Sequence, residues 1–170
     1  MEANKKITAG MIVLGACARL LPHPWNFTPM VAIALYSGAK SAKMWTGILA
    51  TLAAMLISDA VIGFHSGMWV VYGALVVTVL AGRFVRERSG VLPIVGGAFV
   101  AGLLFFVITN FAVWVGSGMY PHTLAGLGMC FAAAIPFYGN QLASDAFYTA
   151  VLFGGHAVLT RMTEPQPQAA

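Results

Sequence analysis

Three polar side chains stand inside otherwise apolar stretches of this 170-residue sequence, and they are the groups most suited to chemistry. Asp59, Asn110 and Asp145 each interrupt an apolar run. A charged residue costs roughly 2.5–3.5 kcal/mol at the centre of a bilayer, so such residues are usually functional or paired. Counted at about 1.5 Å per helical residue, all three lie roughly 8–9 Å below the same-side ends of their runs. This common depth predicts a pocket that opens to one side, here termed the outer side.

A basic residue near the same depth offers a competing interpretation. Arg19 lies close to the outer end of the first apolar run and could neutralise Asp59 or Asp145. The ion pair would then be structural, and the polar groups would hold helices together. A Ser-Asp-Ala triplet occurs at both Ser58–Ala60 and Ser144–Ala146, and it is compatible with either interpretation.

Aromatic and imidazole side chains gather in the predicted outer loops. They are typical of an interfacial belt, and they could also form the mouth of a ligand site. In the second case the aromatic rings stack on the ligand while the polar groups bind its edge. The predicted binding set is Arg19, Trp25, Asn26, Asp59, His65, Trp69, Asn110, Trp114, Tyr120, His122 and Asp145.

The sequence does not predict an enzyme, a resident cofactor or a metal site. It lacks the HExxH, CxxC, Walker and GxSxG motifs, and the spacing of its outer histidines fits no known metal site. A membrane enzyme that uses Asp145 and His156 as acid and base is the least favoured alternative.

The composition requires that these residues be held by membrane helices. Hydrophobic residues make up 59% of the chain and charged residues 8%, against about 25% charged residues in an average soluble domain. We therefore predict an all-α integral membrane protein with one domain, residues 1–162, and a disordered polar tail, residues 163–170. Cys17 and Cys130 are predicted to be buried free thiols. The net charge of +4 is spread between apolar runs, so we expect no nucleic-acid partner.

Six apolar runs and the positions of the basic residues predict the topology. With six spans and a cytoplasmic N-terminus, all Lys and Arg residues except Arg19 fall on inner segments. This favours a multi-pass protein of the bacterial inner membrane with both ends cytoplasmic. The segment Leu124–Ile135, bracketed by prolines, is either a seventh short span or an outer re-entrant or capping helix, and the charges favour the second because a seventh span would place Arg161 outside. The runs are Ile7–Leu21, Met30–Ala39, Trp45–Phe64, Met68–Gly82, Val91–Val115 and Gln141–Thr160, and the inner basic residues are Lys5, Lys6, Lys40, Lys43, Arg83, Arg86, Arg88 and Arg161.

Two further patterns concern helix arrangement. Ile57–Trp69 and Ile108–Tyr120 resemble each other at an offset of 51 residues, which predicts two spans that run in the same direction. Small residues also recur at every fourth position, which allows helices to approach closely. Three such stripes are Thr46-Ala50-Ala54-Ser58, Ala74-Thr78-Gly82 and Ala146-Ala150-Gly154.

The predicted topology resembles that of the substrate-capturing S component of energy-coupling-factor (ECF) vitamin transporters. Asn26–Ala39, Leu56–Gly73 and Thr109–Val115 also resemble an uncharacterised bacterial family assigned to transport of this type. The likeness covers roughly residues 15–157 and implies a six-transmembrane-helix bundle of the S-component type.

The resemblance implies a protein that binds a vitamin-like or cofactor-like small molecule from the outer side and transports it inward. Cobalamin, the first candidate, would be cargo. The resemblance implies the lipid bilayer as one partner. It leaves two possibilities for a protein partner: an ECF coupling subunit with ATPases, or a solitary transporter that needs no coupling subunit. Small residues at AxxxA spacing form the usual coupling surface on the first helix; here the nearest match is Ala50–Ala54 on the third, which favours a solitary transporter. The alternative function is an accessory membrane subunit that packs against partner proteins.

Overall fold

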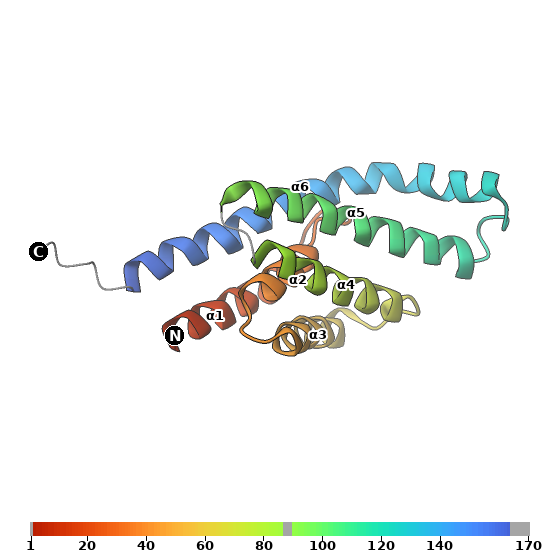
Figure 1. The fold of residues 1–170 in the computed structure, drawn as a ribbon. Coiled ribbons are helices and arrows are strands. Elements are labelled where there is room, and N and C mark those ends of the chain that lie inside the picture. Colours follow the sequence, from red (N-terminus) through yellow and green to blue (C-terminus); the bar gives the residue numbers. More distant parts are fainter. Residues whose placement is uncertain (1, 87–89, 164–170) are drawn as a thin grey trace, which may run out of the picture.

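The computed structural model describes residues 2–86 and 90–163, and these ranges contain six α-helices and no β-strand. The all-helical class is therefore confirmed. The helices cross the bundle back and forth, so both ends of the described chain lie at one end of the molecule (Figure 1). They are α1 (Glu2–Arg19), α2 (Met30–Lys40), α3 (Met44–Ile62), α4 (Met68–Arg86), α5 (Val91–Gly116) and α6 (Leu124–Thr163).

The short helix α2 forms the core of the bundle. It contacts all five other helices, and every residue from Met30 to Ala39 is buried. Its sequence, MVAIALYSGAK, carries small or aliphatic side chains on all faces, as a helix enclosed by other helices requires. Pro29 stands at the N-cap, where its missing N–H costs no helical hydrogen bond.

The closest helix contact joins α2 to α4 through two glycines. A Cβ atom on Gly38 would collide with the Val79 carbonyl, and a Cβ on Gly82 would collide with the Leu35 carbonyl. Gly82 belongs to the predicted stripe that also contains Ala74 and Thr78, both fully buried. This stripe therefore packs inside the bundle, as expected for small residues at a membrane helix interface.

Four of the described helices, α3, α4, α5 and α6, are long and apolar enough to cross a membrane. Large apolar side chains point outward from them, and α5 buries only Ala98, Ala101 and Gly102. An outward apolar surface of this extent indicates a membrane-embedded protein. The helix α1 carries several charged residues, and α2 has only 11 residues.

The prediction of a separate outer helix at Leu124–Ile135 is wrong, because this segment and the last apolar run form one helix of 40 residues, α6. Pro136 lies inside α6 and does not end it. A proline deprives one carbonyl of its helical partner and permits a bend, and membrane helices tolerate this. The axis of α6 changes direction along its length in Figure 1. At its other end α6 includes Thr163, which was predicted to begin the tail; residues 164–170 lie outside the described ranges.

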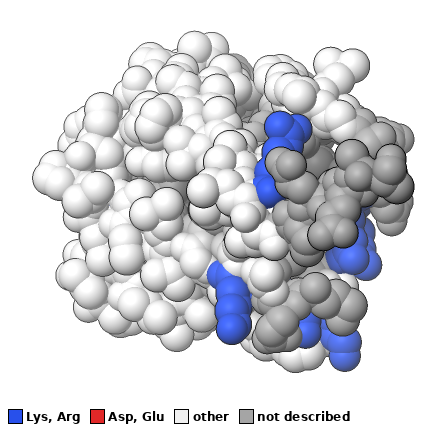
Figure 2. Space-filling view, turned by 90° about the vertical axis from the view of Figure 1, so that its left-hand side faces the viewer, with Lys and Arg blue, Asp and Glu red and all other residues white. Residues whose placement is uncertain are grey.

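The basic residues predicted on one side gather at the end of the bundle that carries the two termini. Viewed from that end, Lys and Arg atoms stand out, and no Asp or Glu is visible among the described atoms (Figure 2). Arg88, also predicted there, falls outside the described residues. Both cysteines are free; Cys130 is buried as predicted, whereas Cys17 is exposed.

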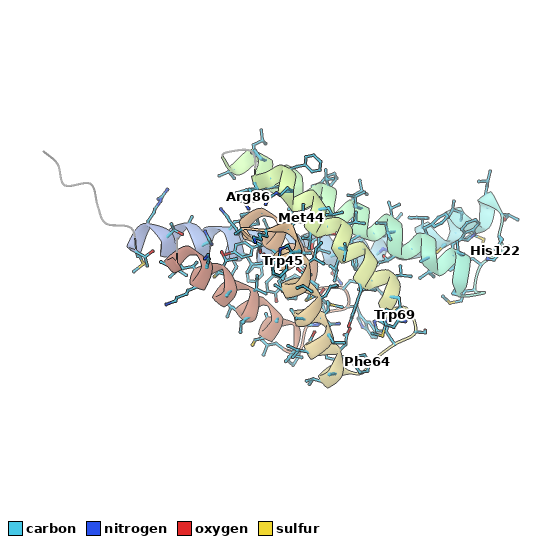
Figure 3. All side chains as sticks on the ribbon, turned by 60° about the horizontal axis from the view of Figure 1, so that its bottom comes forward. Met44, Trp45, Phe64, Trp69, Arg86 and His122 are labelled. Atoms are coloured by element: carbon cyan, nitrogen blue, oxygen red, sulfur yellow. The ribbon has the colours of Figure 1, made fainter. Side chains whose placement is uncertain are left out.

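The predicted repeat is reproduced only in part. In Figure 3 α3 and α5 both run away from the end that carries the termini, but they are steeply inclined to each other, and α3 is seen almost end-on in Figure 1. After the first Ser-Gly-Met turn α4 starts at once at Met68, whereas residues 117–123 form a longer connection before α6. The two halves therefore differ at the end where the predicted site residues lie.

Candidate functional site

The first group of predicted site residues forms an ion-pair network between helices. The Arg19 guanidinium at the end of α1 donates from Nη2 to Asp59 Oδ1 on α3 at 2.6 Å, and it also donates to Ser58 Oγ. The Tyr72 hydroxyl on α4 donates to Asp59 Oδ2 at 2.7 Å. The Asp59 side chain is 1% exposed and that of Arg19 13%. This network connects three helices, as the competing interpretation of the sequence proposed.

Two predicted residues lie beside that network without joining it. The Trp69 ring meets the Tyr72 ring edge-on with centroids 6.4 Å apart, and Trp69 is largely exposed. His65 is exposed in the connection between α3 and α4. Figure 3 shows Trp69 and Phe64 at one corner of the molecule and His122 at the tip of the α5–α6 hairpin, so the far end has two separate parts.

The second group lines a cavity of about 400 Å³. Trp25 and Asn26 come from the α1–α2 connection, Asn110 from α5 and Tyr120 from the α5–α6 connection. The α5–α6 connection lies at the end opposite the termini, whereas the α1–α2 connection lies against the middle of α6, at Asn140 and Ser144 (Figure 1). We call this space the loop cavity; its other lining residues are Phe106, Val113, Cys130, Ala133, Ala134 and Phe137.

The α1–α2 connection is fixed on α6 by side-chain bonds to its backbone. The Asn140 amide donates to the Trp25 carbonyl at 3.0 Å, and the Ser144 hydroxyl donates to the Thr28 carbonyl at 2.6 Å. Asn26 has a φ of +59°, in the left-handed region that asparagine tolerates better than most residues. These contacts hold Trp25, which is 81% exposed, at the mouth of the loop cavity.

The α5–α6 connection is fixed on the end of α5. The Trp114 indole N–H donates to the Pro121 carbonyl at 2.9 Å, and its ring meets the His122 ring with centroids 5.5 Å apart. Trp114 and His122 therefore shape the connection that carries Tyr120, but they do not line the loop cavity.

The structure separates Asn110 from the two carboxylates with which it was grouped. The Asn110 amide donates to the Phe106 carbonyl at 2.8 Å on its own helix, and the residue lines the loop cavity. Asp145 is 3% exposed and packs on Gly102 of α5, where the Gln141 amide lies 3.5 Å from its Oδ2. Asp59 and Asp145 thus lie at contacts between helices. Neither aspartate lines the loop cavity, so they share no cavity with Asn110.

Sequence reasoning missed the walls of the loop cavity. Phe106, Phe137 and the alanines at 133 and 134 are apolar residues within apolar segments, so no local pattern separates them from lipid-facing neighbours. Cys130, whose thiol lies 3.4 Å from the Asn110 carbonyl, was noted only as a buried thiol. Two polar anchors could have been suspected, because Asn140 directly precedes the predicted run Gln141–Thr160 and Ser144 is a polar residue within its first turn.

His156, the candidate base of a membrane enzyme, lies in the core. Its Nδ1 is 2.6 Å from the Tyr36 hydroxyl of α2, and the two rings meet edge-on. Neither His156 nor Asp145 lines the loop cavity. The histidine therefore joins α6 to α2, as a buried membrane histidine commonly does.

The comparisons with known proteins give a family and no function. No curated protein and no solved structure matches the chain. One family model, described as a family of unknown function (DUF6580), matches residues 2–168. Since this match spans nearly the whole chain, the protein belongs to the family of unknown function DUF6580.

Proposed function

We propose that the protein binds a small ring-containing molecule in the loop cavity and carries it across the bilayer. The observation that supports this most is the meeting of Trp25, Asn26, Asn110 and Tyr120 around about 400 Å³ of space. Binding sites for small molecules are commonly cavities of about 300–1,000 Å³ with apolar walls and a few polar groups.

The lining predicts the chemical class of the ligand. Aromatic rings from Trp25, Phe106 and Tyr120 suit a flat ring, and the described lining contains no charged residue, which favours a neutral ligand face. The Asn110 amide nitrogen is already bonded to its own helix, so its side-chain oxygen is the group that would accept a ligand hydrogen bond. A volume of about 400 Å³ suits one or two rings better than the corrinoid of cobalamin.

The direction of transport follows from charge. Basic residues gather at the end with the termini (Figure 2), and basic ends of membrane proteins usually face the cytoplasm. The loop cavity then opens to the outer side of an inner membrane that the six helices span, as in the S components that the sequence resembles. The same resemblance leaves two energy sources, a coupling subunit with ATPases or solitary operation.

Filling the loop cavity is expected to abolish ligand binding. In Ala133→Trp the added indole would occupy the cavity that Ala133 lines, whereas Ala132→Trp places the same group one residue away on an exposed position outside the lining. Purified full-length protein is tested by thermal-shift titration against thiamine, pyridoxine, biotin, riboflavin and cobalamin, and by mass spectrometry of co-purified small molecules. We expect Ala133→Trp to lose at least tenfold in affinity, and Ala132→Trp to bind like the unmodified protein.

Uptake of the same radiolabelled compounds, in cells that lack their own importer, tests transport. A protein that binds none of the panel, carries no co-purified compound and supports no uptake would contradict the proposal. Equal loss in both tryptophan variants would also contradict it, because the effect would then not depend on the cavity.

The second candidate is an accessory membrane subunit, and the placement of the two carboxylates favours it. Asp59 joins α1, α3 and α4, Asp145 packs on Gly102 of α5 with its side-chain partner Gln141 on its own helix, and neither lines the loop cavity. If this candidate is correct, Asp59→Asn and Asp145→Asn change the stability or assembly of the protein, and no variant changes uptake.

A further inference from the structure

A second and larger hollow lies between α1 and α3, and we call it the α1–α3 groove. Its volume is about 1080 Å³. The stripe Thr46-Ala50-Ala54-Ser58 lines it on α3, and α1 contributes alanines and aliphatic side chains, among them Ala9, Ile12 and Val13. The stripe that was noted in the sequence thus lines the groove, with Thr46 and Ala50 half-buried and Ala54 and Ser58 buried toward α1.

The groove is basic at one end only. Lys5, Lys40, Lys43 and Arg86 line it near the termini, and its described lining contains no carboxylate. Arg86 donates to the carbonyls of Ser41 and Ala42, which holds the α2–α3 connection and so positions the lysines on either side of it. Arg86 and Trp45, both labelled in Figure 3, belong to this lining, and Figure 2 shows Lys and Arg atoms at the end of the molecule that carries the termini.

The length of the groove matches one leaflet of a bilayer. From Trp45 to Ile57, both in its lining, α3 rises about 18 Å. One leaflet of hydrocarbon is about 15 Å deep. Trp45 is largely exposed beside the basic end, where tryptophan is typical of the membrane interface. A molecule in the groove would therefore contact basic side chains at the depth of the lipid headgroups. Below that depth it would contact apolar side chains.

We infer that the α1–α3 groove binds an anionic phospholipid of the surrounding bilayer. The phosphate lies among Lys40, Lys43 and Arg86, and one acyl chain follows the α3 stripe toward Ser58. Basic pockets between membrane helices on the cytoplasmic side bind anionic lipid headgroups, because lysine and arginine attract the phosphate at short range at the membrane surface. The separation of charge at one end from apolar wall along the rest matches a lipid, whereas a hydrophobic partner helix would not need the cations.

Removal of two groove cations tests the headgroup contact. Lys40→Gln/Lys43→Gln is compared with Lys6→Gln/Arg161→Gln, which removes two exposed cations from the same end outside the groove lining. Native mass spectrometry of the full chain in detergent counts adducts with phosphatidylglycerol and with phosphatidylcholine of the same acyl chains. Each basic residue near a membrane surface contributes about fivefold in affinity, so we expect a loss of about thirtyfold for phosphatidylglycerol in the groove variant alone. Equal loss in both variants, or equal binding of the two lipids by the unmodified protein, would overturn the inference.

A steric pair tests the acyl contact and guards against misfolding of the charge variant. Ala53→Phe fills the groove, and Ala60→Phe adds the same ring on an exposed position of α3 outside the lining. We expect phosphatidylglycerol adducts to fall at least fivefold only in Ala53→Phe. If Ala53→Phe instead dissociates a dimer, or releases a partner protein, while lipid adducts persist, the groove is a protein interface and the inference is wrong.

Discussion

Replacing Arg19 by methionine is expected to lower the free energy of unfolding by about 3–5 kcal/mol, because removal of one partner leaves the other as an uncompensated buried charge. The remaining charge is the Asp59 carboxylate, which is 1% exposed and, among the residues that the structure describes, keeps the Tyr72 hydroxyl as its side-chain donor. The effect is measured by reversible unfolding with SDS in mixed micelles. Arg161→Met, which removes an exposed arginine from the last turn of α6, is the matched control and should change stability little.

Replacing Asp59 instead of Arg19 should lower the free energy of unfolding by a smaller amount. In Asp59→Leu the Arg19 side chain, already 13% exposed in the last turn of α1, can turn its guanidinium toward the interface. The double variant Arg19→Met/Asp59→Leu removes both charges and should recover most of the loss, since an apolar pair is often as stable as a buried ion pair. If Arg19→Met costs no more than Arg161→Met, the pair does not stabilise the bundle.

Replacing Gly38 by alanine is expected to cost about 2–3 kcal/mol in the same measurement, because overpacking of a well-packed core costs about this much. The new methyl group would collide with the Val79 carbonyl on α4. A backbone atom cannot rotate away, so the central helix must move from α4 and loosen its other contacts. Gly73→Ala on α4 is the control, because a Cβ there meets no atom within 4 Å; it should be neutral or slightly stabilising.

The double variant Gly38→Ala/Gly82→Ala sharpens this test. The two glycines face each other, and a Cβ on Gly82 would lie 3.0 Å from the Gly38 Cα. Once the first alanine has separated the helices, the second should add less than its own cost, so the two losses are not additive. A Gly38→Ala protein as stable as Gly73→Ala would show that α2 and α4 do not need this close approach.

The residues that the sequence identified correctly are those that are unusual in lipid. Arg19 and Asp59 stood out because charge is rare in apolar runs, and pairing with each other was one of the two interpretations offered for them. The stripe through Gly82 stood out because small residues are needed where helices touch. The stripe Ala146-Ala150-Gly154 had the same spacing, yet it faces outward from α6. The spacing of small residues therefore predicted a helix face with small side chains, but not whether another helix or lipid packs against that face.

Pro136 shows the limit of local signals in a membrane protein. In water a proline between two apolar segments usually marks a break, which is why Pro136 bounds the segment that the charge distribution predicts on the outer side. In α6 the helix continues through Pro136, because no water is available in lipid to take over backbone hydrogen bonds that a break would expose. A proline that would indicate a helix end in water therefore lies inside a continuous helix in lipid.

By itself, the sequence determined the all-helical class, the membrane environment, the gathering of basic residues at one end and the polar residues that need partners. Each of these follows from composition or from charges that cannot stay alone in lipid. Only the tertiary structure decided which partners those residues find. It places Trp25, Asn26, Asn110 and Tyr120 around the loop cavity, and Asp59 and Asp145 at contacts between helices away from that cavity. The physical reason is that inner and lipid-facing side chains are equally apolar here, so the sequence lacks the contrast that marks a core in water.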